Sequence, residues 1–459
     1  MNPNISQPLP VLSTGEIREI LVKRVDRQKQ AVGIVVGVVE PGARRVIAYG
    51  NLANGDPRAL DGDTIFEIGS ITKVFTSLLL ADMVNRKEVT LDDPASKYLP
   101  ENVGMPERSG KSITLLDLAT HRSGLPPNPG NLKLNPRNPY AADYSVSDLY
   151  QFLSGYTLPR DPGSEFEYSN LGAGLLGHLL ANRAGMDYES LVGTRITQPL
   201  GMPDTGITLS SSMEQRMATG HNAMLAPVGN SELPTLAGAG ALRSSARDML
   251  TFLEALLGYT ESPLAPAMKA SLEARRTAGK ANIGLGWLLN AAGGKEIAMH
   301  DGGTGGFRSF IGFDAKARIG VVVLSNGTRS GVEDIGLHLL NPKLPLANPE
   351  PPKQRTRIPI DPKLLDNYTG RYQMTPNFIF EITRDGDRLF AQAFVQLPHN
   401  PPGDPTAAPK FELFAEGEKN FFARVTDKQI AFETGSAGRA TSLILYQAGR
   451  EPMPATRLP

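Results

Sequence analysis

A proline-rich stretch in the last third of the chain divides it into two differently patterned parts. Seven of the 22 residues from 341 to 362 are proline, a density that keeps a segment stiff and extended. The length of 459 residues also exceeds what one ordinary hydrophobic core organises. We therefore expect a first domain over residues 1–340, a linker over 341–361 and a second domain over 362–459.

The first part predicts an α+β (α/β) domain, in which an antiparallel sheet is flanked by helices and stands beside an all-helical lobe. Strand-like runs occur near both ends of this part, and residues 90–240 between them are mostly helical with Pro- and Gly-rich connections. We expect strands over 31–39, 45–51, 283–290, 296–300, 307–313 and 318–325, and helices over 14–27, 244–257 and 332–340.

The second part predicts a small all-β domain. Short apolar runs over 377–382, 388–391, 421–425 and 442–446 are separated by turns such as Asp385-Gly386. Several short strands between turns are typical of an antiparallel barrel or a sandwich, and the pattern does not choose between them. No residue pattern in this part indicates catalytic chemistry.

Ser70 and Lys73 are the first candidate catalytic residues. They lie three positions apart, hence on one helix face, and precede an apolar run over 74–81 that predicts a buried helix. Serine needs a neighbouring base to act as a nucleophile, and a buried lysine can supply one. The alternative is a buried serine beside a lysine that reaches solvent, because Ser-x-x-Lys arises about once or twice by chance in a chain this long.

Two later motifs favour the catalytic interpretation. Tyr168-Ser169-Asn170 follows a Pro-Gly turn and precedes a Gly-rich helix, while His300-Asp301-Gly302-Gly303 follows an apolar run and opens a glycine-rich turn. A second Tyr-x-Asn, at 49–51, precedes Ser70 and is excluded by its order in the chain. A lone histidine is usually a core residue, so His300 could instead be structural.

The order Ser-x-x-Lys, Tyr-x-Asn and His-x-Gly resembles the class C β-lactamase and penicillin-binding serine hydrolase family. Its relatives include D-Ala-D-Ala peptidases, D-aminopeptidases and esterases. The resemblance covers roughly residues 15–340 and extends to the segments 91–94, 118–126 and 284–287. Residues 367–372 resemble the opening of the lipocalin-like domains that are appended to some hydrolases of this kind.

The resemblance implies a covalent mechanism at Ser70. Ser70 would attack a substrate carbonyl, and Lys73 and Tyr168 would move its proton and return one to the leaving group. Water would then hydrolyse the acyl-enzyme. No Gly-x-Ser-x-Gly occurs in the chain, so the other common serine-hydrolase arrangement is absent.

Substrate binding is implied at the second and third motifs. Asn170 is expected to hold the substrate amide, and His300 to face the substrate carboxylate or the Tyr168 hydroxyl. Gly302 and Gly303 follow on the same strand, and the backbone N–H groups of Ser70 and Gly303 would form the oxyanion hole.

The third motif departs from the Lys-Thr-Gly of the β-lactamases proper. His300 replaces a permanent cation with a group that is neutral much of the time near pH 7, and Asp301 adds a carboxylate beside it. We expect weaker binding of the carboxylate that β-lactams and D-Ala peptides share, and therefore inefficient β-lactamase action.

Composition excludes several other classes of function. Lys plus Arg and Asp plus Glu both number 47, so no basic field invites nucleic acid. Cysteine is absent and the six histidines are scattered, which argues against a metal site, and no cofactor is implied. Residues 172–177 match Gly-x-Gly-x-x-Gly but follow no strand, so a nucleotide site is rejected. No apolar run is long enough to span a membrane.

The expected function is a serine hydrolase that cleaves β-lactams, D-amino-acid peptides or small esters through a Ser70 acyl-enzyme. One alternative is a carboxylesterase with little β-lactamase activity. Another is a non-catalytic scaffold that binds peptidoglycan fragments, which the intact Ser70, Lys73 and Tyr168 disfavour. The expected partner is a small molecule or short peptide. The N-terminus lacks the pattern of a signal peptide, so we expect a cytoplasmic protein or one whose signal has been removed; compartment and oligomeric state stay open.

Overall fold

A computed structural model describes residues 11–459, apart from 133, 136–137, 280, 293, 352–354, 397–405, 409, 425–427 and 448–450. The N-terminal stretch 1–10, residues 352–354 of the expected linker and Val425 of an expected strand thus lie outside the described residues. The chain forms two compact units. One holds the residues up to Glu350 except Asn222–Ala226, and the other holds those five and Pro351–Pro459.

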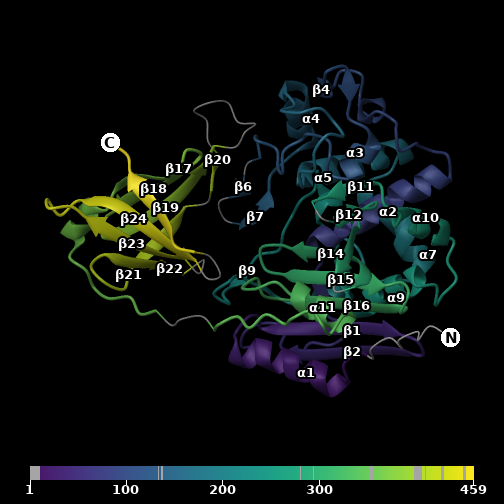
Figure 1. The fold of residues 1–459 in the computed structure, drawn as a ribbon, viewed down its shortest axis with the longest axis horizontal. Coiled ribbons are helices and arrows are strands. Elements are labelled where there is room, and N and C mark those ends of the chain that lie inside the picture. Colours follow the sequence, from purple (N-terminus) through teal and green to yellow (C-terminus); the bar gives the residue numbers. More distant parts are fainter. Residues whose placement is uncertain are drawn as a thin grey trace, which may run out of the picture. The chain divides into compact units, whose positions relative to one another are not determined.

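The first unit is built on an antiparallel sheet whose strands come from both ends of that unit (Figure 1). Its strand order in the described chain is β11-β12-β13-β14-β15-β16-β1-β2. The strands are β1 (Gly33–Glu40), β2 (Ala43–Gly50), β11 (Arg276–Ala278), β12 (Ala281–Ile283), β13 (Leu288–Ala292), β14 (Lys295–Gly303), β15 (Arg308–Asp314) and β16 (Ile319–Ser325). The antiparallel sheet expected from the sequence is confirmed, but residues 283–290 are not one strand, because Gly284–Trp287 turn between β12 and β13.

Helices cover both faces of this sheet, which explains why β1 and β16 are apolar along most of their length. One face packs on α1 (Thr14–Val22) and α11 (Glu333–Leu340), and the other on α9 (Ala246–Leu256). The seven residues of β16 are all buried, as expected for a strand with two covered faces. The helix predicted over 14–27 ends in a wide π-turn over Lys23–Arg27.

The serine segment runs through the middle of the unit. Gly69–Ile71 form a 3-10 turn that leads into α2 (Thr72–Asn85), where every residue from Thr72 to Met83 is buried. A helix that is apolar on all sides belongs in a core. Ser70 therefore stands on the turn that enters a buried helix.

The helical lobe lies between the two sequence segments that build the sheet. Its longest helix, α5 (Asn170–Ala184), begins directly after Tyr168-Ser169, with Ser169 as its N-cap. The other elements are α3 (Leu115–Ala119), α4 (Val146–Gly155), α6 (Tyr188–Val192), α7 (Gln198–Leu200), α8 (Ser211–Arg216), α10 (Ala265–Ser271), the 3-10 turns η3 (Ala95–Tyr98) and η5 (Ala237–Ala239), the π-turn η4 (Gly193–Thr197), and the small hairpins β4-β5 (Glu107–Arg108, Lys111–Ser112), β6-β7 (Leu134–Asn135, Asn138–Ala142) and β8-β9 (Gly220–His221, Pro227–Val228).

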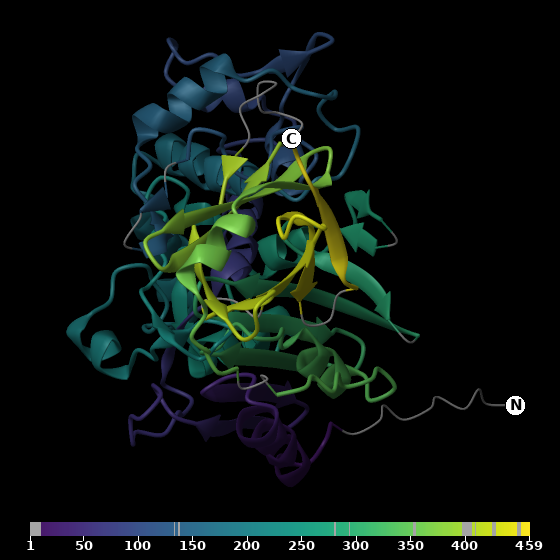
Figure 2. The ribbon, with the colours of Figure 1, turned by 90° about the vertical axis from the view of Figure 1, so that its left-hand side faces the viewer.

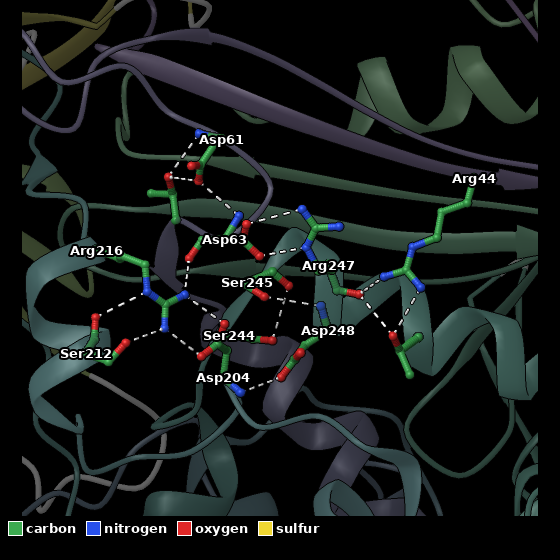
Figure 3. A network of polar contacts seen from close by, with 12 residues as sticks. Arg44, Asp61, Asp63, Asp204, Ser212, Arg216, Ser244, Ser245, Arg247 and Asp248 are labelled. Carbon is green, nitrogen blue, oxygen red and sulfur yellow. Dashed lines mark hydrogen bonds and ion pairs between the residues drawn. The ribbon is translucent and has the colours of Figure 1, made fainter.

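A short strand pair joins the serine turn to α9. Strand β3 (Ile65–Glu67), which leads to Ser70, pairs with β10 (Arg243–Ser245), which leads into α9. Beside this pair lies a network of charged and hydroxyl side chains, in which Arg247 pairs with Asp63 and the buried Asp248 accepts hydrogen bonds from the Asp204 N–H and the Thr205 hydroxyl (Figure 3).

The second unit is a closed antiparallel barrel rather than a sandwich. Its described strands follow the order β18-β17-β25-β24-β23-β22-β21-β19, and pairing of β18 with β19 closes the ring (Figure 2). They are β17 (Gly370–Thr375), β18 (Phe378–Asp385), β19 (Arg388–Val395), β21 (Phe411–Ala415), β22 (Asn420–Ala423), β23 (Lys428–Thr434), β24 (Ala440–Gln447) and β25 (Met453–Arg457), with the 3-10 turn η6 (Pro362–Asn367) before them and β20 (Thr406–Ala407) beside β19.

Aromatic rings fill the interior of the barrel. Tyr368 stacks on Phe432 with ring centroids 4.6 Å apart, and Phe421 meets both rings edge-on. Tyr372 and Phe380 are completely buried in the same cluster. The barrel interior is thus a packed core of the kind that small barrels form.

The first ten residues of the expected linker are attached to the first unit. Arg24, which is 3 % exposed, pairs with Asp334 and donates to the Ala347 carbonyl over 3.1 Å. Further along, Gln28 donates to Asn348 over 2.9 Å and Gln30 donates to the Glu350 carbonyl over 3.1 Å. We call residues 341–350 the strap.

Candidate active site

Ser70 and Lys73 are in direct contact. The Lys73 Nζ lies 3.0 Å from the Ser70 Oγ. Ser70 is half-buried at the helix entrance, whereas Lys73 is only 2 % exposed. A lysine at this depth needs polar partners, since an unpaired charge would be costly to bury.

Three oxygen atoms surround the Lys73 amine. Besides Ser70, they are the Asn170 Oδ1 at 2.9 Å and the Ala239 carbonyl, on η5, at 2.6 Å. Burial lowers the pKa of Lys73 to about 7, while the charge of Asp301 opposes this shift. A neutral amine has two N–H groups and one lone pair. The two carbonyl-type oxygens can accept the N–H groups, which leaves the lone pair to accept the Ser70 proton.

Tyr168 completes the group around Ser70. Lys73 Nζ lies 4.8 Å from the centre of its ring. The residue is 37 % exposed, but burial of its hydroxyl raises the pKa of Tyr168 far above its ordinary value, and the hydrogen bond with the Ser70 hydroxyl offsets only part of that rise. Tyr168 therefore stays protonated at neutral pH and can pass a proton on, whereas Lys73 is the group with a free lone pair.

His121 holds the loop that carries Tyr168. Its carbonyl accepts the Glu167 N–H over 2.8 Å, and its Nδ1 accepts the Ser169 N–H over 3.2 Å. Its ring lies 4.5 Å from the Tyr168 ring. Burial lowers the pKa of His121 well below its ordinary value, and the charge that Lys73 or His300 carries when protonated lowers it further, so Nδ1 remains an acceptor.

Asn170 spans two neighbours at the start of α5. Its Oδ1 accepts from Lys73, and its Nδ2 donates to the Asn128 Oδ1 over 3.3 Å. Its own N–H and that of Leu171 both donate to the Pro127 carbonyl. The side chain expected to hold the substrate amide thus also orients the Lys73 amine.

The third motif lies at the end of β14. His300 is 6 % exposed and its Nδ1 lies 2.6 Å from the Asp301 carbonyl. Burial lowers the pKa of His300, the charge of Lys73 adds to that, and the charge and carbonyl of Asp301 oppose it. His300 is therefore neutral at physiological pH, and it does not replace the cation of a Lys-Thr-Gly motif.

Gly302 and Gly303 bring β14 against the serine turn. Gly302 pairs with Ser309, whose hydroxyl donates to the Ile68 carbonyl over 2.8 Å. Gly69 has a φ of +51°, and a Cβ built on it would stand 2.7 Å from the Gly303 nitrogen. Side chains are excluded from this contact, so the backbone of the Ser70 turn lies next to that of Gly303.

The structure thus gathers the seven residues singled out from the sequence, namely Ser70, Lys73, Tyr168, Asn170, His300, Gly302 and Gly303, around one turn. Sequence reasoning missed Ala239, Asn128 and the role of His121. His121 lies in the segment 118–126 that carries part of the family resemblance, whereas nothing in the sequence points to the carbonyl of Ala239. Among the described residues, no group of three or more His, Asp or Glu side chains is placed to hold a metal ion. None of the described helices is both long and apolar enough to cross a membrane.

Known proteins are similar to this chain in sequence. The beta-lactamase family model matches residues 18–341, and a domain of unknown function, DUF3471, matches 354–457. The D-alanyl-D-alanine-carboxypeptidase/endopeptidase AmpH of Escherichia coli (strain K12) is 32 % identical over 312 residues, which cover 64 % of this chain and 79 % of that protein. A penicillin-binding protein of Bacillus subtilis (strain 168) is 26 % identical over 431 residues, covering 88 % and 90 %.

A solved structure agrees with these sequence matches. The class C beta-lactamase from Rhodobacter sphaeroides superposes with a TM-score of 0.59 at 29 % identity, over 68 % of this chain and 93 % of that one. The family match covers most of the first unit and more than half of the chain. The chain therefore belongs to the beta-lactamase family and is a serine hydrolase.

Proposed function

We propose that the first unit hydrolyses amide or ester bonds of small substrates, short D-amino-acid peptides among them, through an acyl-enzyme on Ser70. The contact that carries this proposal is the 3.0 Å approach of the Lys73 amine to the Ser70 hydroxyl, with the other polar partners of Lys73 being oxygen acceptors. Relatives that are named carboxypeptidases and penicillin-binding proteins support the choice of substrate.

The chemistry follows from the protonation states. Neutral Lys73 takes the Ser70 proton as Oγ bonds to the substrate carbonyl carbon, and the oxyanion is met by backbone N–H groups at Ser70 and Gly303. Tyr168 lies beside both groups and passes the proton to the leaving amine or alkoxide. Attack of water on the acyl-enzyme repeats the transfers and releases the acid.

A carboxylesterase with little β-lactamase activity is the second candidate. The observation that favours it is the neutral, buried His300, since an efficient β-lactamase places a cation at that motif. Both candidates use the same nucleophile and differ only in the substrates that they prefer.

The test replaces the nucleophile and its two proton carriers. Ser70→Ala should abolish hydrolysis of 4-nitrophenyl butyrate and covalent labelling by a fluorescent penicillin. Lys73→Ala and Tyr168→Phe should each lower kcat by about a thousandfold or more, because members of one proton-transfer unit act together. Ser77 is buried in α2 one turn beyond Lys73, and it provides the matched control. Ser77→Ala should keep full activity. Ester hydrolysis that persists in Ser70→Ala would refute the proposal.

A further inference from the structure

A permanent cation stands beside the candidate oxyanion hole, on a strand that the sequence motifs do not include. Arg308 opens β15, directly across from Gly303 in β14. Its Nη1 donates to the carbonyls of Thr304 and Phe307, each over 3.1 Å. The guanidinium is thereby fixed over the turn that follows the third motif.

Gly303 leaves room for this guanidinium. A Cβ built on Gly303 would stand 2.6 Å from the Arg308 Nη1 and 3.3 Å from its Cζ. The guanidinium thus occupies the space that a side chain at 303 would fill. Arg308 as a whole is half-buried.

The adjoining edge of β14 is where a substrate would lie. Pairing of β13 with β14 ends at Leu288–Met299, whereas pairing with β15 continues to Gly303–Arg308. Residues 300–303 therefore turn their second edge toward the serine turn, which Gly69 brings against Gly303. A substrate carbonyl held by the Gly303 N–H would place its flanking groups within reach of Arg308.

The other charged groups nearby do not supply the same attraction. His300 is neutral, and Lys73 is engaged with Ser70. Asp301 and Glu333 carry carboxyl groups. Burial raises the pKa of Glu333, the charge of Asp301 adds to this, and the charge of Arg308 opposes it. Arg308 is thus a cation whose charge acts on the Glu333 carboxyl group.

We propose that Arg308 is a specificity-determining residue that binds a carboxylate of the substrate beside Gly303. The inference rests on the proposed function, because it assumes that substrates are acylated at Ser70. Arginine suits the task, since its planar guanidinium stays charged at every relevant pH and can bind a carboxylate through two parallel N–H groups. The cation lost from the third motif is in this way supplied from the next strand.

The test compares esters that differ in charge alone. One series consists of phenylacetylglycyl esters of 3-hydroxybenzoate, 3-hydroxybenzamide and 3-(aminomethyl)phenol, whose leaving groups are anionic, neutral and cationic. A second pair, 4-nitrophenyl esters of glutaric acid and of its monoamide, places the carboxylate in the acyl part. In the full-length enzyme, at least one carboxylate ester should exceed its neutral partner in kcat/KM.

Arg308→Gln should remove that preference and leave the neutral esters nearly unchanged. We expect a fall of about 10- to 100-fold in kcat/KM for the preferred carboxylate ester, the range that a lost charge-assisted hydrogen bond produces. Arg308→Lys should recover part of it. Arg318→Gln is the matched control, because Arg318 is an exposed arginine at the other end of β15-β16 and its loss changes the net charge equally.

The outcomes separate this inference from the proposed function. Equal losses on charged and neutral esters in Arg308→Gln would mean that Arg308 only holds the turn, and would overturn the inference. A wild-type preference for the aminomethyl ester, or no preference at all, would also overturn it. The Ser70-dependent hydrolysis of the neutral esters would stand in each of these cases, and only its absence would refute the proposed function.

Discussion

Lys73 has surroundings that would let a lysine serve as a base at neutral pH. Its burial lowers the pKa to about 7, and the Asn170 and Ala239 oxygens hold the two N–H groups of the neutral amine. The carbonyl of Ala239 comes from η5, 166 positions along the chain. The basicity of the site is thus set by three segments that only the fold brings together.

The activity should accordingly follow the deprotonation of Lys73. For a neutral ester, kcat/KM should rise with pH and level off above a midpoint near pH 7, because only the neutral amine can accept the Ser70 proton. The charge of Asp301 raises the pKa of Lys73, so Asp301→Asn should move the midpoint to lower pH. Stopped-time assays of 4-nitrophenyl butyrate hydrolysis between pH 5 and 9 would measure both.

Glu296→Gln provides the comparison for that experiment. Glu296 lies on the same strand, and its exposed side chain pairs with Lys316. Its loss changes the net charge as Asp301→Asn does, and the midpoint should not move. A midpoint that fails to shift in Asp301→Asn would show that the pH dependence belongs to another group.

At the scale of single residues, the sequence identifies the candidate site residues better than it identifies the contacts between them. The proximity of Ser70 and Lys73 follows from helix geometry alone, because positions i and i+3 share a face. Tyr168, Asn170 and His300 could be named only by resemblance to a family. The roles proposed for Arg308 and His121 could not be predicted, because they depend on which strand or loop lies beside the motif. No local sequence pattern encodes that.

Among the elements, the β3-β10 pair shows how a polar network supports the serine turn. Arg216 binds both oxygens of Asp204, and Arg247 binds Asp63, next to the strand that leads to Ser70 (Figure 3). Asp248 lies 5 % exposed at the start of α9. Burial raises its pKa to about 6, although hydrogen bonds from Thr205 and Asp204 oppose the rise.

Asp248→Asn should stabilise the first unit at neutral pH. A carboxyl group whose pKa is raised from 3.8 to about 6 by folding contributes stability below pH 4, and loses it as pH rises through 6. Asparagine keeps an oxygen acceptor without the charge, so the gain at pH 8 should approach but not exceed about 3 kcal/mol. At pH 4 the variant and wild type should unfold alike.

The measurement can be confined to the first unit. Trp287 is the one tryptophan in the chain, and it is 1 % exposed in this unit, so its fluorescence follows the unfolding of this unit. Asp63→Asn should change the stability in the opposite direction. The hydrogen bond from Arg247 lowers the pKa of Asp63, so this variant should lose stability at neutral pH. A lower unfolding temperature of Asp248→Asn at pH 8 would contradict the expected gain.

The elements themselves were predictable where patterns are strong. β1, β2, β15 and β16 follow from continuous apolar runs that end at turns. In the barrel, β21 and β23 were missed, because Glu412 in β21 and Gln429 and Glu433 in β23 interrupt the apolar pattern. Closure into a barrel rests on the pairing of β18 with β19, and no strand pattern distinguishes that pairing from an open sandwich.

At the scale of the whole molecule, the contacts of the strap indicate where the first unit ends. Residues Ala347, Asn348 and Glu350 are held by Arg24, Gln28 and Gln30. The domain boundary that we expected at residue 340 would cut the chain before all of these contacts. We therefore propose that the independent hydrolase unit extends to Glu350.

Truncation tests this boundary. A chain that ends at Glu350 should fold, keep neutral-ester hydrolysis and unfold close to the wild-type temperature in Trp287 fluorescence. A chain that ends at Leu340 should be less stable by about 2–4 kcal/mol, since it loses several hydrogen bonds and leaves the buried Arg24 with fewer partners. Insoluble protein from the longer truncation would show that the barrel belongs to the same folding unit.

The contact between Gly69 and Gly303 has a consequence for how such an enzyme can be altered. Bare backbone meets bare backbone there, with no side chain between the serine turn and the end of β14. No substitution can bring these two segments closer together, and any side chain at 69 would force them apart. Laboratory evolution toward new substrates should therefore accumulate its changes in the Tyr168 loop and near Arg308, and leave Gly69 and Gly303 unchanged.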